Sequence, residues 1–239
     1  MPGTHPIVDM VRSHGPTLSV GLVSANLMAL GDDVARLECA GVRLAHFDVM
    51  DGAYVPMLTV GPQFIKSVHT SMLKDVHLMV REPLVSVPDY VAAGADLVTI
   101  HPDACTHPHR VLQALASMSN ARNPGRGIAR GVALNPGTPL EWLAPLIDQV
   151  ELVMLLAINP GWSQQPFIPS TIERLAETRR RLDATGRAIL LAVDGGITRR
   201  NIGELAGLGI DVVVTGSAVF DGDASANVAE MIAALRGSG

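Results

Sequence analysis

Residues 93–101 read AGADLVTIH, a stretch in which a glycine that can end a helix is followed at once by a short apolar strand. Similar small turns precede apolar runs at 40–42 (AGV) and 208–211 (LGID). A glycine at a helix C-terminus allows the chain to reverse within a few residues, which a helix must do to lead into the next parallel strand. The stretch therefore predicts repeated strand–helix–strand units.

Eight apolar runs alternate with helical patterns along the chain, and we expect strands at 17–23, 43–49, 74–80, 96–101, 127–134, 151–158, 188–194 and 211–216. Helical windows lie between them, such as 31–41, which Asp32 or Asp33 could cap, and 170–186, which opens at Ser170. Eight strands with eight helical segments predict an α/β fold, a single (β/α)8 TIM barrel over 17–236. A doubly wound open sheet is the alternative, but no GxGxxG motif follows the first run.

Composition narrows the class of protein. The 239 residues are 48% hydrophobic, enough for a large aliphatic core, and the net charge of −5 with no basic run argues against a nucleic-acid groove or an anionic membrane surface. No stretch reaches the roughly 18 apolar residues of a membrane span, and residues 1–16 lack a signal-peptide core, so we expect a flexible leader there. Two cysteines without CxxC spacing suggest a reducing cytoplasm. The expected partner is a small molecule.

Polar side chains end several of the predicted strands, and in a (β/α)8 barrel these ends carry the active site. His46 and Asp48 are two residues apart, so both point to the same face of their strand. His77 and Asp194 end two other strands. Two imidazoles and two carboxylates from three strands form a plausible site for Zn²⁺, Mn²⁺, Fe²⁺ or Co²⁺. Each residue taken alone is better explained as a hydrogen-bonded core histidine or a loop-capping aspartate, and it is their convergence that favours a metal.

Other residues near these strand ends have two interpretations. Met50 and Met79 are core filler by default, but they could form an apolar wall that excludes water from a charged intermediate. His101 could reach the pocket or cap a loop. Asp51 is expected to belong to the turn that leads out of the second strand.

Several motifs follow one another between residues 18 and 222. In order they are HFDVMDGAYVP with LTVGP, DVHLMV, AGADLVTIH, GVALNPGTPLE, NPGW with QPFIPST, VDGGI and GSAVF. In these motifs the chain resembles the ribulose-phosphate 3-epimerase family. The resemblance implies a homo-oligomeric (β/α)8 enzyme of carbohydrate metabolism that converts D-ribulose 5-phosphate to D-xylulose 5-phosphate, a pentose phosphate reaction. It implies one divalent metal ion (Zn, Fe, Mn or Co) held by His46, Asp48, His77 and Asp194, with Asp48 and Asp194 as acid and base on opposite faces of the substrate.

The chemistry explains these residue types. Inverting a stereocentre beside a ketone removes a proton from one face and returns one to the other, so two acid/base groups are needed. A metal bound to the carbonyl oxygen acts as a Lewis acid that stabilises the enediolate.

The resemblance also implies a set of substrate-binding residues: Ser24, Met50, Met79, His77, Asn159, Gly161, Ser163, Gly195, Gly196, Gly216 and Ser217. The chain departs from the family in the phosphate loop, where members typically read GFGGQ and residues 161–167 read GWSQQPF. If that loop needs a positive φ at Gln164, a residue other than glycine costs about 1 kcal/mol or more, so we expect another loop shape. Gly21 stands where the family has a serine, Asn26 where it has an aspartate, and Leu156 where it has a methionine.

These departures leave the substrate open, and an allulose 6-phosphate or a tetrulose phosphate is the alternative sugar. A non-catalytic sugar-phosphate-binding barrel is a further alternative, which retention of the four metal-competent residues disfavours. A metal-dependent hydrolase would predict an HxH motif on the first strand, and TLSVGLV has no such ligand.

Overall fold

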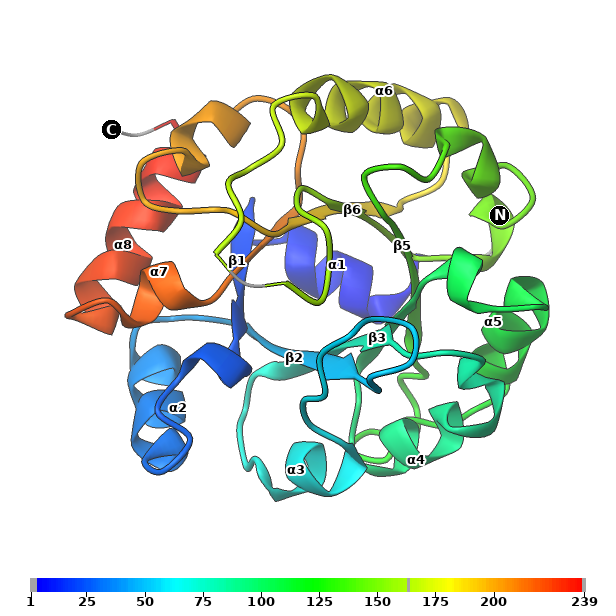
Figure 1. The fold of residues 1–239 in the computed structure, drawn as a ribbon, viewed down its shortest axis with the longest axis horizontal. Coiled ribbons are helices and arrows are strands. Elements are labelled where there is room, and N and C mark those ends of the chain that lie inside the picture. Colours follow the sequence, from blue (N-terminus) through cyan, green and yellow to red (C-terminus); the bar gives the residue numbers. More distant parts are fainter. Residues whose placement is uncertain (1–3, 163, 238–239) are drawn as a thin grey trace.

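Eight parallel strands form a closed barrel in the computed structural model, which describes residues 4–162 and 164–237 (Figure 1). Each strand pairs with the next one along the chain, and β8 pairs with β1. The strands are β1 (Thr17–Gly21), β2 (Leu44–Met50), β3 (Leu73–Met79), β4 (Leu97–Ile100), β5 (Ala129–Leu134), β6 (Leu152–Leu156), β7 (Leu190–Asp194) and β8 (Val212–Thr215). The predicted (β/α)8 barrel is confirmed.

Successive side chains of each strand point to opposite faces, and in this barrel both faces are covered. On β2, Phe47 and Val49 pack outward in the cluster between strands and helices, whereas Leu44 belongs to a separate cluster inside the barrel. Double coverage explains why the strands read as nearly continuous apolar runs. On the interior face of β2, however, Leu44 is followed by His46 and Asp48.

The helices form an outer ring: α2 (Leu30–Cys39), α3 (Pro62–Ser67), α4 (Val87–Ala92), α5 (Pro108–Ala116), α6 (Thr171–Ala184), α7 (Ser217–Phe220) and α8 (Ala224–Leu235). Short 3-10 turns occur at η1 (Leu22–Ser24), η2 (Pro83–Val85), η3 (Pro102–Ala104), η4 (Leu140–Leu143), η5 (Ile147–Gln149) and η6 (Ile202–Leu205).

The expectation of a helix after every strand is wrong in two connections. Within the fully described segments 135–151 and 195–211, only η4 and η5 follow β5, and only η6 follows β7. Pro139 and Pro145 interrupt the first segment, and proline lacks the N–H that a helix interior requires. Gly203 and Gly207 lower the helix propensity of the second.

Of the predicted helix ends, the C-terminal glycines are confirmed, whereas the side-chain caps at the N-termini are not formed. Gly41 and Gly94 have φ of 82° and 97°, the left-handed conformation expected where a helix turns back to a strand. At the start of α2, however, the cap position is Ala29, without a side-chain hydrogen bond. Asp33 instead accepts a hydrogen bond from the Asn26 backbone N–H at 3.1 Å. Ser170 occupies the cap position of α6, but its side chain makes no capping bond.

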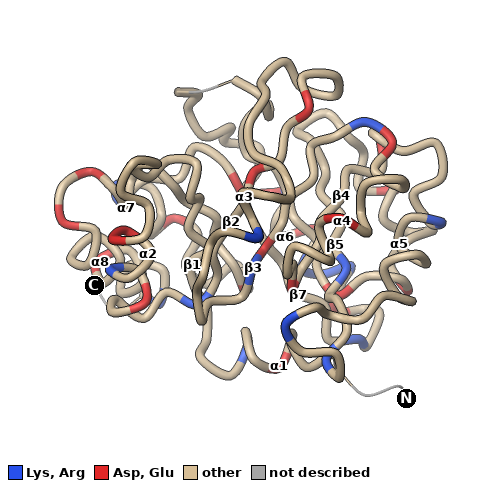
Figure 2. Tube along the Cα trace, turned by 90° about the horizontal axis from the view of Figure 1, so that it is seen from below, with Lys and Arg blue, Asp and Glu red and all other residues tan. Residues whose placement is uncertain are grey.

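Residues 6–12 correct the expected flexible leader of residues 1–16, because they form helix α1 (Pro6–Arg12). Ile7, Val8 and Val11 are buried, and they pack in the interior cluster with the strand beginnings Leu44 and Leu97. Figure 1 shows α1 across the middle of the barrel, and Figure 2 shows it at one end of the molecule. The helix thus closes the N-terminal end of the barrel, where the interior apolar residues would otherwise contact water.

In the part of the chain that the structure describes, no helix is long and apolar enough to cross a bilayer. Acidic and basic residues are scattered over many elements (Figure 2).

Truncating the buried face of α1 tests its role as a closing element. Ile7→Ala is expected to lower the free energy of unfolding by about 2–5 kcal/mol, because it leaves a cavity against the barrel floor. Met10→Ala, on the same helix with a side chain that is 42% exposed, is the control. Its expected change is within about 0.5 kcal/mol. Urea unfolding followed by circular dichroism measures both, and equally small effects would show that α1 does not stabilise the barrel.

Candidate metal and active site

Four residues meet at the C-terminal end of the barrel: His46 and Asp48 from β2, His77 from β3 and Asp194 from β7. One ligand atom from each lies within 4.8 Å of the others. The strand register accounts for part of this, because Asp48 is directly paired with His77. Both histidines are fully buried, whereas the side chains of Asp48 and Asp194 are 19% and 16% exposed. The carboxylates therefore face the open side of the cluster.

Asp75, on the side of His46 that faces away from the cluster, fixes the orientation of this imidazole. Its Nδ1 lies 2.8 Å from Asp75 Oδ2, which also accepts a hydrogen bond from Ser19 Oγ at 2.8 Å. With the Nδ1 hydrogen donated to Asp75, the lone pair of Nε2 points into the cluster, 3.3 Å from Asp48 Oδ1. A carboxylate behind a histidine is the usual way in which proteins orient a metal ligand.

His77 is held in a similar way by His101, which is also fully buried. The two Nε2 atoms are 2.8 Å apart, so one donates and the other accepts. If His77 presents the lone pair of Nδ1 to the cluster, its Nε2 donates to His101. The remaining hydrogen of His101 then sits on Nδ1, which is 3.8 Å from Asp103 Oδ1.

Opposite charges organise the cluster. Burial alone lowers the pKa of His46, but the negative charges of Asp75 and Asp48 outweigh burial and raise this pKa well above its usual range. The pKa of His77 is also raised, by Asp194 and Asp48 against the effect of burial. Burial would raise the pKa of Asp48, yet His46 and His77 hold it well below its usual range. Burial and the neighbouring His77 lower the pKa of His101 well below its usual range, which keeps this imidazole neutral.

The cluster fits a divalent cation. His46 Nε2 and His77 Nδ1 are buried and make no hydrogen bond within the described structure, and both face carboxylate oxygens at 3.3–3.5 Å, so all four groups point into one space that a cation could occupy. Ligands at about 2.0–2.2 Å from one ion lie within about 4.4 Å of each other. Small side-chain movements would therefore complete a coordination sphere. Two imidazoles with two carboxylates are a donor set for a borderline transition metal.

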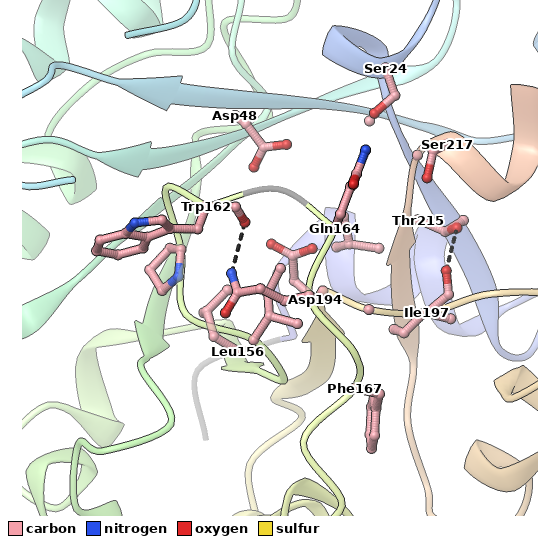
Figure 3. A pocket seen from close by; sticks show the side chains of 18 of the residues that line it. Ser24, Asp48, Leu156, Trp162, Gln164, Phe167, Asp194, Ile197, Thr215 and Ser217 are labelled. Carbon is pink, nitrogen blue, oxygen red and sulfur yellow. Dashed lines mark hydrogen bonds between the residues drawn. The ribbon is translucent and has the colours of Figure 1, made fainter. Parts of the chain in front are cut away.

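An open cavity of ≈ 780 Å³ lies in front of the carboxylates. Figure 3 shows Asp48 and Asp194 pointing into it from two strands. Of the predicted substrate-binding residues, eight line the cavity: Ser24, Met50, Met79, Gly161, Gly195, Gly196, Gly216 and Ser217. His77 lies buried in the metal-competent cluster, Asn159 does not line the cavity, and Ser163 falls outside the described residues.

Asn159 holds the loop that follows β6. Gln165 Nε2 donates to the carbonyl oxygens of Asn159 and Trp162 at 2.6 and 2.8 Å, and Gln165 Oε1 accepts from Asn159 Nδ2 at 3.2 Å. On the other side of the loop, Gly161 has φ 87°, and a Cβ there would lie 2.7 Å from the Val55 side chain. The loop backbone is thus held by the hydrogen bonds of Gln165 and packed closely against Val55 at Gly161.

The expectation that this loop avoids a positive φ at Gln164 is wrong, because Gln164 adopts φ 58°. The anchors at Gly161 and Gln165 offer a physical reason, since surrounding contacts can hold a residue in a sparsely populated conformation. The prediction for Asp51 is confirmed: its Oδ1 accepts hydrogen bonds from the backbone N–H groups of Ala53 and Tyr54 at 2.9 and 2.8 Å.

Sequence reasoning missed Asp75, which lies behind His46, and several polar residues that line the cavity, Thr198 and Asn201 among them. Asp75 could have been found, because it stands two residues before His77 on one strand, as His46 stands two before Asp48. Thr198 and Asn201 line the cavity just after the VDGGI motif, but nothing in their spacing distinguishes them from ordinary loop residues. Gly21 and Leu156, two departures from the family pattern, also line the cavity.

Comparison with known proteins agrees with this geometry. Residues 17–220 match the model of the Ribulose-phosphate 3 epimerase family. Ribulose-phosphate 3-epimerase of Escherichia coli (strain K12) is 42% identical over 207 residues, which are 85% of this chain and 88% of that protein. Ribulose-phosphate 3-epimerase 1 of Cupriavidus necator is 38% identical over 226 residues, which are 92% of this chain and 90% of that protein.

A solved structure, 3-hexulose-6-phosphate synthase of Salmonella typhimurium, matches with a TM-score of 0.67 over 93% of this chain and 100% of that chain. Its sequence identity of 18% supports the fold alone. The family match covers almost the whole barrel, including β2, β3 and β7 with their four converging side chains. The chain belongs to the ribulose-phosphate 3-epimerase family.

Proposed function

We propose that the protein is a metal-dependent 3-epimerase that interconverts D-ribulose 5-phosphate and D-xylulose 5-phosphate. As a member of its family it is an isomerase that acts on carbohydrates. The observation that carries the finer proposal is the pair of carboxylates, Asp48 and Asp194, which reach one cavity from two strands beside two buried histidines. This is the arrangement that a proton transfer on two faces of one carbon requires.

Each aspartate has a distinct task at the C3 carbon of the substrate. Asp48 takes the proton from one epimer while Asp194 supplies a proton to the opposite face, and the two exchange roles in the reverse direction. A C–H bond beside a ketone is a weak acid, so the negative charge that develops on the ketone oxygen must be stabilised. A divalent ion held by His46, Asp48, His77 and Asp194 would supply that stabilisation as a Lewis acid.

The surrounding residues hold these groups and limit water. His46 Nε2 and His77 Nδ1 lie 3.3 and 3.5 Å from the same oxygen of Asp48, so this carboxylate has a defined position. Met79 and Leu156 line the cavity with side chains that are almost fully buried. An apolar wall lowers the local dielectric and strengthens the electrostatic interactions on which proton transfer depends.

The far side of the cavity suits a phosphate. A Cβ at Gly196 would lie 2.7 Å from the Phe167 backbone nitrogen, and one at Gly216 would lie 2.5 Å from Ser24 Oγ. These distances show that close packing against Phe167 and Ser24 requires glycine at both positions. Both glycines also line the cavity, where backbone N–H groups would be effective donors to phosphate oxygens. Gly195 and Ser217 complete this side in our proposal.

The homo-oligomeric state and the cytoplasmic location stay predictions, the first from the family resemblance and the second from the two isolated cysteines. The allulose 6-phosphate and tetrulose phosphate alternatives are separated by the substrate panel below, as is the non-catalytic alternative.

Exchange of the substrate C3 hydrogen with deuterated solvent tests the function. The metal-loaded protein is expected to exchange this hydrogen in D-ribulose 5-phosphate faster than in an allulose 6-phosphate, a tetrulose phosphate or the free ketoses. Treatment with a chelator should abolish exchange, and one divalent ion per chain should restore it. Absence of exchange with every ketose phosphate would sink the proposal, and faster exchange with another sugar phosphate would reassign the substrate.

Asp194→Asn removes one of the two acid/base groups. Epimerisation is expected to fall by about 10²–10⁴-fold, the usual contribution of a positioned acid or base. Asp148→Asn, an exposed aspartate in η5, is the matched control and should keep full activity. Circular dichroism and metal content, measured alongside turnover, separate loss of chemistry from loss of fold or ion. Near-normal turnover in Asp194→Asn would remove this residue from the mechanism.

Asp75→Asn tests the support behind His46. Loss of the carboxylate charge weakens the hydrogen bond that orients the imidazole, so affinity for Zn²⁺ or Co²⁺ is expected to fall by about 10–100-fold. The exposed Asp9→Asn in α1 is the control. Competition with a metal-binding dye measures both affinities. Equal affinities in the two variants would show that Asp75 does not tune the site.

A further inference from the structure

Gln164 is an unusual residue for its backbone conformation. Among the described residues other than glycine, only Gln164 and Glu82 have a positive φ, at 58° and 49°. Such a conformation costs of order 1–3 kcal/mol and persists where the surroundings impose it, often at ligand-binding sites. Gln164 belongs to the loop between β6 and α6, and it lines the cavity of the candidate active site.

The side chain of Gln164 is directed into the cavity. Figure 3 shows it extending from the loop, with its carboxamide toward Ser24 and Ser217. The neighbouring Gln165 holds this loop through hydrogen bonds to the carbonyl oxygens of Asn159 and Trp162. Gln164 thus reaches the side of the cavity that is lined by the glycines that follow β7 and β8, Gly195, Gly196 and Gly216.

The charge of the cavity explains why a neutral amide suits this position. Its described lining contains two carboxylates, Asp48 and Asp194, and no lysine or arginine. An anionic group of a substrate must therefore be bound by neutral donors. A cationic side chain in the same space would be attracted to Asp48 and Asp194, whereas a carboxamide donates hydrogen bonds without adding charge.

We infer that Gln164 determines specificity for the terminal phosphate of the substrate, because its carboxamide N–H donates to a phosphate oxygen opposite the backbone N–H groups at Gly196 and Gly216. This inference rests on the proposed function and deepens it. Phosphate recognition then depends partly on a side chain, which a single substitution can remove. A hydrogen bond to a charged acceptor contributes more than one between neutral groups, so its loss is measurable.

Kinetics of three Gln164 variants test the inference. Gln164→Ala is expected to raise the KM for D-ribulose 5-phosphate about tenfold with kcat nearly unchanged, the pattern of lost ground-state binding. Gln164→Glu places a carboxylate opposite the phosphate and should raise KM further. Exchange with unphosphorylated D-ribulose should be the same in all variants. Gln63→Ala, an exposed glutamine in α3, is the matched control.

Gln164→Gly distinguishes phosphate binding by the Gln164 side chain from phosphate binding by the loop backbone. It relieves the strain of a positive φ, so it should unfold at a higher urea concentration than the wild type, yet its KM should rise as in Gln164→Ala. A wild-type KM in Gln164→Gly would assign phosphate binding to the backbone and overturn the inference. An unchanged KM in Gln164→Ala would overturn it as well.

Binding of inorganic phosphate, measured by calorimetry on the same variants, is independent of turnover. Weaker binding to Gln164→Ala than to Gln63→Ala is the expected result, and equal binding contradicts the inference. If the wild type exchanges no ketose phosphate but its phosphate affinity still depends on Gln164, the proposed function fails while the role of Gln164 stands.

Discussion

The pairing of β2 with β3 is the constraint on which the site depends. Its register sets His46 beside Asp75 and Asp48 beside His77, so that two imidazoles and two carboxylates alternate across neighbouring interior positions. Buried groups of this kind are stable only as a mutually compensating set, because an unpaired buried charge costs several kcal/mol. A shift of β2 by one residue would turn His46 and Asp48 toward the outer helices and leave Asp75 and His77 without these partners. The long ladder between these two strands therefore secures the chemistry as well as the barrel.

The apolar residues that stabilise the barrel and the polar residues of the candidate site lie at opposite ends of its axis. At the N-terminal end, apolar residues from the strand beginnings meet α1 and are sealed from water. At the C-terminal end, the interior becomes polar at His46 and His77 and then opens into the cavity. This division is common to (β/α)8 enzymes, in which the C-terminal strand ends and the loops vary without disturbing the core. Gly21 and Leu156 end β1 and β6, and Gln164 lies in a loop, so these departures change the cavity while the four metal-competent residues stay together.

Sequence alone predicts those features of this molecule that follow from patterns within a single strand or helix. Strand positions follow from apolar runs, and the convergence of His46, Asp48, His77 and Asp194 follows from strand alternation combined with the known location of barrel active sites. Tertiary contacts decide the rest. The apolar face of α1 is only Ile7, Val8 and Val11, too few residues to show what they pack against. Gln164 adopts a positive φ that its residue type does not predict, and the hydrogen bond between His77 and His101 joins residues 24 apart in the chain.

The contact between Gly161 and the segment 55–56 has a mechanical consequence. The segment follows β2, whose end carries Asp48, while Gly161 belongs to the loop that carries Gln164. With a built Cβ only 2.7 and 2.8 Å from the side chains of Val55 and Pro56, the two loops touch without spare room. Any larger residue at position 161 would therefore push the two loops apart. The end of the cavity that handles protons and the end that faces the phosphate meet at this glycine, so one substitution there would disturb both.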